Sequence, residues 1–144
     1  MEKLCIRPIA LGLIQHQGYV FVSKGKDTVK AETFYRFLGG GIDFGESSID
    51  ALKREFQEEI QAELTNIEYL TCLDNIFTCS GKPGHELIQL FRCDFADPGF
   101  YRLDHTYTLV EGKNKHDAIW ISVDQVHSGA LNLVPKSCYP YICG

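Results

Sequence analysis

Hydrophobic and polar positions alternate along this chain with two different periods. A period of two, in segments rich in β-branched and aromatic residues, predicts strands. A period of three to four predicts one amphipathic helix, which begins at Ser47 or Ser48 and ends near Gln61. Strands on both sides of a helix predict a single domain of the mixed α/β class. The predicted strands are residues 6–14, 19–24, 34–38, 67–78, 86–95 and 118–121.

Turn-forming residues arrange several of these strands into hairpins. The polar segment 15–18 separates the first two strands and predicts a hairpin between them. Residues 80–84 contain two glycines and a proline and predict a second hairpin, and Gly112 predicts a third. Residues 96–105 are predicted to form a loop, and residues 124–127 fit a short helix.

The predicted helix has a hydrophobic face and, beside it, an acidic face. At about 100° per residue, four hydrophobic residues fall within an arc of about 80° and form the buried stripe. These four are Ile49, Leu52, Phe56 and Ile60. Glu55, Glu58 and Glu59 fall within about 100° on the neighbouring face. Because Glu59 lies beside the hydrophobic stripe, we expect it to be partly shielded from water.

Carboxylates this close repel one another, by a few tenths of a kcal/mol, roughly, for each pair at helical spacing. A divalent cation would relieve this repulsion, and Mg²⁺ and Mn²⁺ prefer carboxylate oxygens as ligands. Considered alone, however, the same pattern is typical of a solvated acidic helix face.

A glycine-rich segment leads from the strand at 34–38 into this helix. Gly39, Gly40 and Gly41 allow the backbone to approach a ligand closely and expose N–H groups, which suits a phosphate. The segment lacks the Lys-Ser/Thr pair of a P-loop and is not a dinucleotide fingerprint. On its own it is therefore also consistent with a plain tight turn.

The spacing of the two features is far more specific than either alone. Gly40, five residues, Glu46, seven residues and then Arg54-Glu55-Phe56-Gln57-Glu58-Glu59 resemble the signature of the Nudix hydrolases, the MutT-like family. The resemblance extends over residues 40–62, and residues 34–46 are similar to one bacterial branch of that family.

This resemblance implies a fold and an activity. The fold is an α/β/α sandwich around a mixed β-sheet, here a single domain over residues 1–144. Members hydrolyse a nucleoside diphosphate linked to another group X, such as nucleoside triphosphates, nucleotide sugars or dinucleotides, with Mg²⁺ or Mn²⁺. A small nucleoside diphosphate derivative is therefore the expected ligand.

The resemblance also implies roles for individual residues. The metal ligands would be Glu55, Glu58, Glu59 and the carbonyl of Gly39. Arg54 would orient one of these carboxylates, and Glu46 would pair with it or support the loop. Gly39, Gly40, Gly41 and Arg36 would lie against the substrate, although Arg36 could instead pair with an acid.

A further carboxylate commonly acts as the general base in this family, and its position varies. Glu86 opens a strand after a turn, and Glu111 precedes the turn at Gly112, so both are candidates. Glu58 could also serve as the base. The residues leave these three alternatives open.

The chain departs from the family pattern at Gln61, where the family has a glycine. That glycine suits a left-handed residue that ends the helix, and Gln61 would cost roughly 1 kcal/mol there. Alternatively, the helix continues through Ala62 and Glu63 to Leu64. Neither alternative changes the predicted metal ligands.

Composition and charge exclude several other classes of protein. A net charge of −5 is unfavourable for binding long nucleic acids. No segment has the roughly 20 apolar residues that span a bilayer, and the N-terminus lacks the layout of a signal peptide. We therefore expect a cytoplasmic protein that does not enter membranes, whose six cysteines are reduced thiols. Dimers are common in the family, so a homodimer is a further expectation.

Two other functions remain as alternatives. The first is a Nudix-fold sensor that binds a nucleotide without turnover, and the second is a structural domain with an acidic face. The group X is not predicted by the signature. We expect it to be recognised by residues 34–36, by the loop at 96–105 and by the C-terminal tail.

Overall fold

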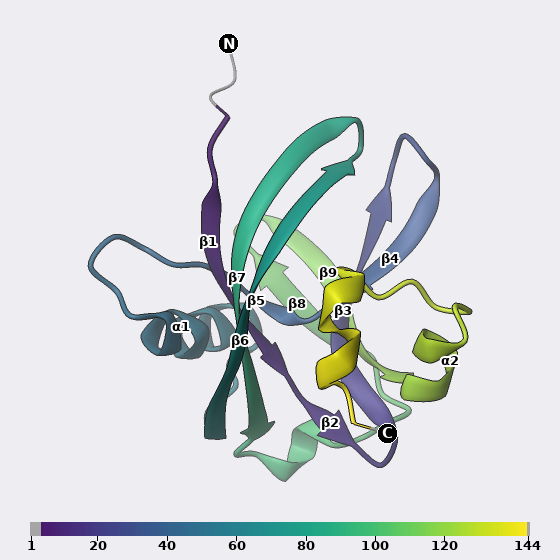
Figure 1. Ribbon diagram of the computed structural model, residues 1–144. Coiled ribbons are helices and arrows are strands. Elements are labelled where there is room, and N and C mark those ends of the chain that lie inside the picture. The colour runs from purple at the N-terminus through teal and green to yellow at the C-terminus, as the bar shows by residue number, and fades with distance from the viewer. Residues whose placement is uncertain (1–3, 144) are drawn as a thin grey trace.

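The computed structural model describes residues 4–143, whose nine strands form two sheets (Figure 1). The first sheet has the order β5-β1-β7-β6, and the second has the order β2-β3-β9-β8 with β4 beside β3. Strands β1 and β7 are parallel, and the other pairs are antiparallel. The strands are β1 (Arg7–Leu13), β2 (Gln15–His16), β3 (Tyr19–Asp27), β4 (Glu32–Arg36), β5 (Leu38–Gly41), β6 (Leu64–Cys79), β7 (Lys82–Phe95), β8 (Tyr107–Glu111) and β9 (Asn114–Ser122).

Helices cover the sheets on both faces. Helix α1 (Ser48–Ile60) packs against β1, β5 and β8, while α2 (Val123–His127) and the 3₁₀ helix η2 (Lys136–Tyr141) lie on the other side (Figure 1). Alternate residues of β1 belong to two hydrophobic cores, because successive side chains of a strand point to opposite faces. Ala10 packs in the core with Phe56, and Leu11 in the core with Val126. The sandwich of helices around mixed β-structure is thus confirmed, with the strands divided between two sheets.

Two of the three predicted hairpins are confirmed. The turn at 80–84 joins the long strands β6 and β7, and the turn at Gly112 joins β8 and β9. The hairpin predicted around 15–18 is only partly right. Most of the segment 6–14 forms β1, which pairs with β5 and β7 in the other sheet, and only Ile14 at its end bonds to β3, accepting from the N–H of Phe21 (3.0 Å). Only the two residues of β2 form the hairpin with β3.

The single strand predicted at 34–38 is wrong, since the chain crosses there from one sheet to the other. Arg36 is the last residue of β4 and pairs with Ser23 of β3, whereas Leu38 begins β5 and pairs with Gly12 of β1. Phe37, at the crossing, is almost completely buried. The crossing brings Arg36 and the three glycines to the junction of the two sheets.

Helix α1 begins and ends as its sequence dictates. The Ser47 hydroxyl accepts a hydrogen bond from the N–H of Asp50, the usual N-cap contact. Gln61 adopts the left-handed conformation, with φ 56° and ψ 40°, and its N–H donates to the carbonyl of Gln57. The helix therefore ends at Ile60, and the alternative of a helix that continues to Leu64 is wrong.

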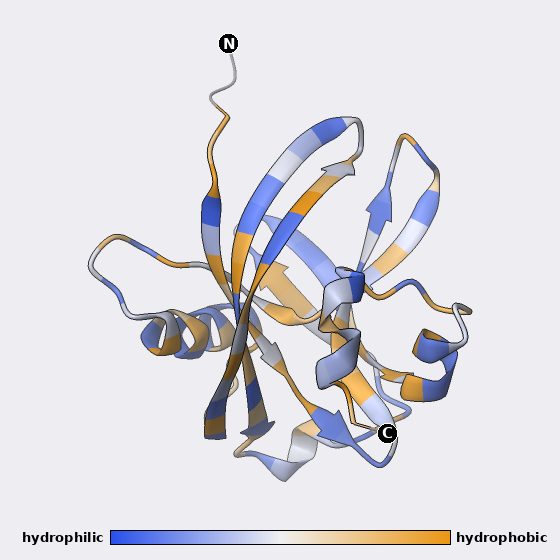
Figure 2. Cartoon of the chain, in the orientation of Figure 1, coloured by the Kyte–Doolittle hydropathy of each residue, from blue (hydrophilic) through white to orange (hydrophobic). Residues whose placement is uncertain are grey.

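The hydrophobic stripe of α1 differs from the prediction at one position. Leu52 and Phe56 are fully buried, as expected, but Ile49 is exposed and Ala51 is buried. Ile49 lies in the first turn of α1, next to the loop at 43–47, most of whose residues are exposed. Both hydrophilic and hydrophobic residues are visible along α1 in Figure 2, as an amphipathic helix requires.

The C-terminal tail runs beside β4. The N–H of Tyr35 donates to the carbonyl of Asn132 (2.8 Å), and the N–H of Val134 donates to the carbonyl of Tyr35 (2.8 Å). The tail is therefore held close to the crossing at Phe37. Among residues 4–143, no helix is long and apolar enough to cross a membrane.

Candidate active site

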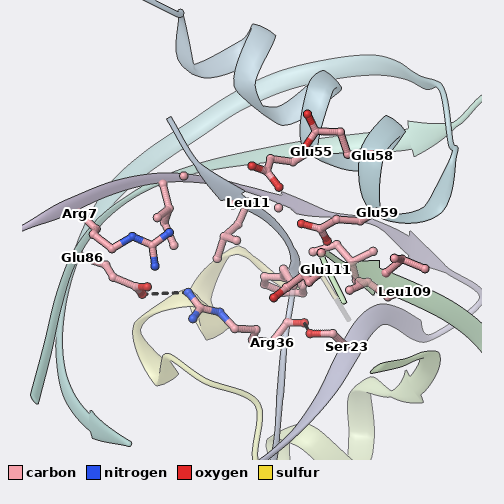
Figure 3. A pocket seen from close by; sticks show the side chains of 18 residues that line it. Arg7, Leu11, Ser23, Arg36, Glu55, Glu58, Glu59, Glu86, Leu109 and Glu111 are labelled. Atoms are coloured by element: carbon pink, nitrogen blue, oxygen red, sulfur yellow. Dashed lines mark hydrogen bonds and ion pairs between the residues drawn. The ribbon is translucent and has the colours of Figure 1, made fainter. Parts of the chain in front are cut away.

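A cavity of about 610 Å³ opens between α1, the glycines of β5 and the edges of both sheets (Figure 3). Its walls contain nine of the ten predicted site residues, and Arg54 is the tenth. The nine are Arg36, Gly39, Gly40, Gly41, Glu55, Glu58, Glu59, Glu86 and Glu111.

One wall of the cavity is acidic and comes from α1. Figure 3 shows Glu55 and Glu59 pointing into the cavity, with Glu111 from the end of β8 facing them. Glu59 is only 5% exposed, which confirms the expected shielding beside the hydrophobic stripe. The side chain of Glu58 is 59% exposed, so it lies at the rim.

Burial and neighbouring acids change the acidity of Glu59. Desolvation raises its pKa from 4.5 to about 9, and a hydrogen bond and the charge of Glu55, followed by the charges of Glu111 and Glu58, act in the same direction. In the absence of metal, Glu59 therefore holds a proton near neutral pH. A cation bound here would replace that proton.

Two glycines of β5 leave room for this arrangement. A Cβ on Gly40 would lie 2.5 Å from the Glu55 carboxyl carbon, so a side chain here would displace the carboxylate. Gly39 has φ +146°, and a Cβ there would lie 1.9 Å from the carbonyl oxygen of Ala10. Glycine at 39 is thus required by the backbone, and glycine at 40 leaves room for the Glu55 carboxylate in its present position.

Arg54 lies behind the acidic wall and connects it to the loop at 42–47. Its Nε and Nη2 donate to the Glu46 carboxylate (2.8 and 2.9 Å), and Nη2 also donates to the carbonyl of Gly41 (2.9 Å). Its Nη1 donates to Glu55 (3.0 Å) and to Glu58 (3.3 Å). The hydrogen bond with Arg54 lowers the pKa of Glu46. Arg54 therefore fixes Glu55 from behind and does not line the cavity.

The opposite wall contains an ion pair that joins distant parts of the chain. Nη2 of Arg36 donates to Oε1 of Glu86 (2.9 Å), and the Asn75 amide donates to the same oxygen (3.2 Å). The Glu86 side chain is 6% exposed. Arg36 thus pairs with an acid in this structure, which is one of the two roles predicted for it. Oε1 of Glu86 is in turn occupied by the donors of Arg36 and Asn75.

Sequence reasoning did not identify Arg7 as part of the site. Arg7 begins β1 and lines the cavity together with Ile9 and Leu11, which share its face of the strand. From the sequence, Arg7 was expected only as one residue of the strand predicted at 6–14. The period of two along Arg7, Ile9 and Leu11 is the signal that places Arg7 on the cavity side.

A second, smaller cavity of about 270 Å³ adjoins the first at Arg36. It lies between the β3–β4 and β6–β7 hairpins. Phe34 and Phe77 contribute to its walls, together with the tail residues Asn132, Val134, Pro135 and Lys136. The loop at 96–105 does not reach either of these two cavities. Its Phe100 stacks on Phe95, with ring centroids 4.5 Å apart.

The donor atoms of the acidic wall suit a hard divalent cation. Within residues 4–143, no three acidic, histidine or cysteine side chains already converge as the ligands of one ion. Nevertheless, carboxylate oxygens are the ligands that Mg²⁺ and Mn²⁺ prefer, and the raised pKa of Glu59 reflects its burial and then the carboxylates around it. The residues present therefore fit such a metal.

The model of the NUDIX domain matches residues 7–142, so the chain belongs to the NUDIX family. This confirms the family that the signature suggested. Membership of this family makes it a hydrolase that acts on phosphoric anhydride bonds.

Solved structures of the same family have the same fold. The MutT NUDIX hydrolase from Burkholderia pseudomallei is 22% identical, with 83% of this chain and 85% of that chain covered and a TM-score of 0.62. A NUDIX hydrolase from Nitrosomonas europaea is 17% identical, with 91% and 82% covered and a TM-score of 0.64. A MutT structure from a study of Aliivibrio salmonicida and Vibrio cholerae is 18% identical, with 95% and 94% covered and a TM-score of 0.60. At these identities the likeness concerns the fold.

Proposed function

We propose that this protein is a metal-dependent pyrophosphohydrolase that cleaves a nucleoside diphosphate linked to another group X. The observation that supports this best is Glu59, a carboxylate buried in the cavity wall beside Glu55 and close to Glu111. A fold that served only as a structural domain would have no need for buried like charges, which lower its stability. A bound cation would offset the repulsion between these carboxylates, and the carboxylates would serve as its ligands.

Glu55, Glu58 and Glu59, together with the carbonyl of Gly39, would hold Mg²⁺ or Mn²⁺. When bound, the metal would neutralise charge on the diphosphate and lower the pKa of an attacking water. Arg54 contributes by keeping Glu55 in place through its hydrogen bond. The glycines of β5 allow a phosphate to approach the backbone closely.

Among the candidate bases, the geometry favours Glu111. Oε1 of Glu86 already accepts hydrogen bonds from Arg36 and Asn75, so protein donors occupy that oxygen. Glu111 faces the acidic wall from the end of β8, at the mouth of the cavity. In hydrolysis, the oxygen of water bonds to phosphorus, the bridging P–O bond breaks, and Glu111 takes the proton released by the water.

The second cavity is the proposed site for part of the substrate beyond the diphosphate. It adjoins the first at Arg36, and Phe34 and Phe77 offer aromatic surface there. Its position is consistent with recognition by residues 34–36 and the tail, as the sequence suggested.

The test is a panel of nucleoside triphosphates, nucleotide sugars and dinucleotides, incubated with Mg²⁺ or Mn²⁺ and followed by mass spectrometry. We expect hydrolysis of at least one class, loss of turnover in EDTA, and a drop of about 100-fold or more in kcat for Glu59→Gln with unchanged far-UV circular dichroism. Glu63→Gln, an exposed acid after the helix, is the matched control. Nucleotide binding without any turnover would instead favour the sensor alternative.

A further inference from the structure

Arg7 places a positive charge on the cavity wall. Among residues 4–143, its side chain forms no ion pair and no hydrogen bond. The other arginine of the cavity wall, Arg36, is neutralised by Glu86. Arg7 therefore offers its guanidinium to whatever enters the cavity.

The most obvious acid partner for Arg7 is already occupied. Arg7 and Glu86 are register partners in the parallel pair β1–β7, so their backbones lie side by side. Even so, the oxygen Oε1 of Glu86 accepts from Arg36 at 2.9 Å and from Asn75 at 3.2 Å, and no ion pair with Arg7 forms. The network around Glu86 leaves Arg7 available.

The position of Arg7 is opposite the acidic wall. Figure 3 shows its guanidinium on the side of Glu86, across the cavity from Glu55 and Glu59. Gly41 leaves space beside it, since a Cβ at Gly41 would lie 3.2 Å from Nη2 of Arg7. Ile9 and Leu11 extend the same face of β1 and give the cavity an apolar floor beneath the charged groups.

We propose that Arg7 binds a phosphate group of the substrate, on the wall opposite the glutamates. The inference rests on the proposed function, since it concerns the same cavity. The planar guanidinium can donate two parallel hydrogen bonds to phosphate oxygens, and here it does so without competition from a carboxylate. Metal on one wall and Arg7 on the other would then share the charge of a diphosphate.

The test compares Arg7→Gln and Arg7→Lys with the wild-type protein. Arg102→Gln is the matched control, because Arg102 is an exposed arginine that lines neither cavity. With the substrate found in the panel, we expect Arg7→Gln to raise KM by roughly 10- to 100-fold, as for a lost charge-assisted hydrogen bond, while kcat changes much less. Arg7→Lys should recover part of the loss, because it keeps the charge but not the bidentate geometry.

A second measurement does not depend on turnover. Calorimetry with inorganic pyrophosphate in excess Mg²⁺ should give binding to wild type and to Arg102→Gln, and weaker binding to Arg7→Gln by a similar factor. An active enzyme whose KM and pyrophosphate affinity are unchanged by Arg7→Gln would overturn the role of Arg7 and leave the proposed function intact. No turnover of the panel, with pyrophosphate binding that still depends on Arg7, would overturn the hydrolase and leave the role of Arg7. A wild-type protein that neither turns over the panel nor binds pyrophosphate would overturn both.

Discussion

Replacing Glu59 by glutamine should stabilise the metal-free protein more and more as the pH rises from about 5 to about 8. Glutamine has nearly the same shape as a protonated glutamate but cannot ionise. Desolvation, Glu55, Glu111 and Glu58 together raise the pKa of Glu59 from 4.5 to about 9. The folded protein therefore retains a proton that the unfolded chain loses once the pH exceeds its ordinary pKa.

The ordinary pKa of Glu59 and its raised pKa in the folded protein determine the direction of this effect and the pH range in which it occurs. Below pH 4.5 the proton is bound in both states and Glu59 costs nothing. As the pH rises towards about 9, only the folded state keeps the proton, so the free energy of unfolding falls by up to about 1.4 kcal/mol per pH unit. From about pH 5 to about pH 8 this amounts to roughly 4 kcal/mol at most. Water in the open cavity can solvate the ionised carboxylate, so we expect about 2 kcal/mol.

The assay is urea unfolding in EDTA at several pH values between about 5 and 8. The difference in free energy of unfolding between Glu59→Gln and wild type should grow by about 2 kcal/mol over that range. The exposed Glu63→Gln variant should follow the wild-type curve at every pH. Curves of Glu59→Gln and wild type that stay parallel would refute the reasoning. Added Mg²⁺ should stabilise wild type at the upper pH far more than the variant, because the cation takes the place of the proton.

Three further outcomes are expected. In steady-state kinetics, Glu111→Gln should lower kcat by about 100-fold or more, whereas Glu86→Gln should act mainly on KM or stability. A larger loss of kcat in Glu86→Gln than in Glu111→Gln would contradict this. Gly40→Ala should displace the Glu55 carboxylate and weaken Mn²⁺ binding by roughly 10-fold or more in calorimetry. Equal Mn²⁺ affinities of the variant and the wild type would show that Gly40 is not needed to position Glu55. Gln61→Gly should remove the strain of a glutamine in the left-handed conformation and raise Tm by roughly 2–5 °C. Gln57→Gly, at an exposed position within the helix, should lower Tm by a similar amount. A fall in Tm for Gln61→Gly would contradict this.

The sequence predicted those parts of the fold that local signals determine. The helix from Ser48, the turn at 80–84 and the turn at Gly112 depend on caps, periodicity and glycine, all of which are read within a few residues. The crossing at Phe37 was missed because residues 34–38 have uniform β-propensity. The sequence of a β segment does not show whether all of its residues pair with the same neighbouring strand.

The same limit explains why the partner of Arg36 and the position of Arg7 were missed. Glu55, Glu58 and Glu59 are neighbours on one helix, so their spacing alone predicts one acidic wall. The Arg36–Glu86 ion pair joins residues 50 apart in sequence, and Arg7 meets the cavity through the pairing of β1 with β7. Such contacts arise from sheet topology, which periodicity does not reveal.

Gln61 and Arg54 explain how the acidic wall is held in place without a metal. The left-handed Gln61 ends the helix directly after Ile60, so Glu59 stays in the last turn, where it is buried. Arg54 balances the charges of Glu46 and Glu55 from behind, but it makes no hydrogen bond with Glu59. The protein thus balances Glu46 and Glu55 with its own cation and leaves Glu59 without a cationic partner. The position that lacks a cationic partner is where a bound cation adds the most binding free energy.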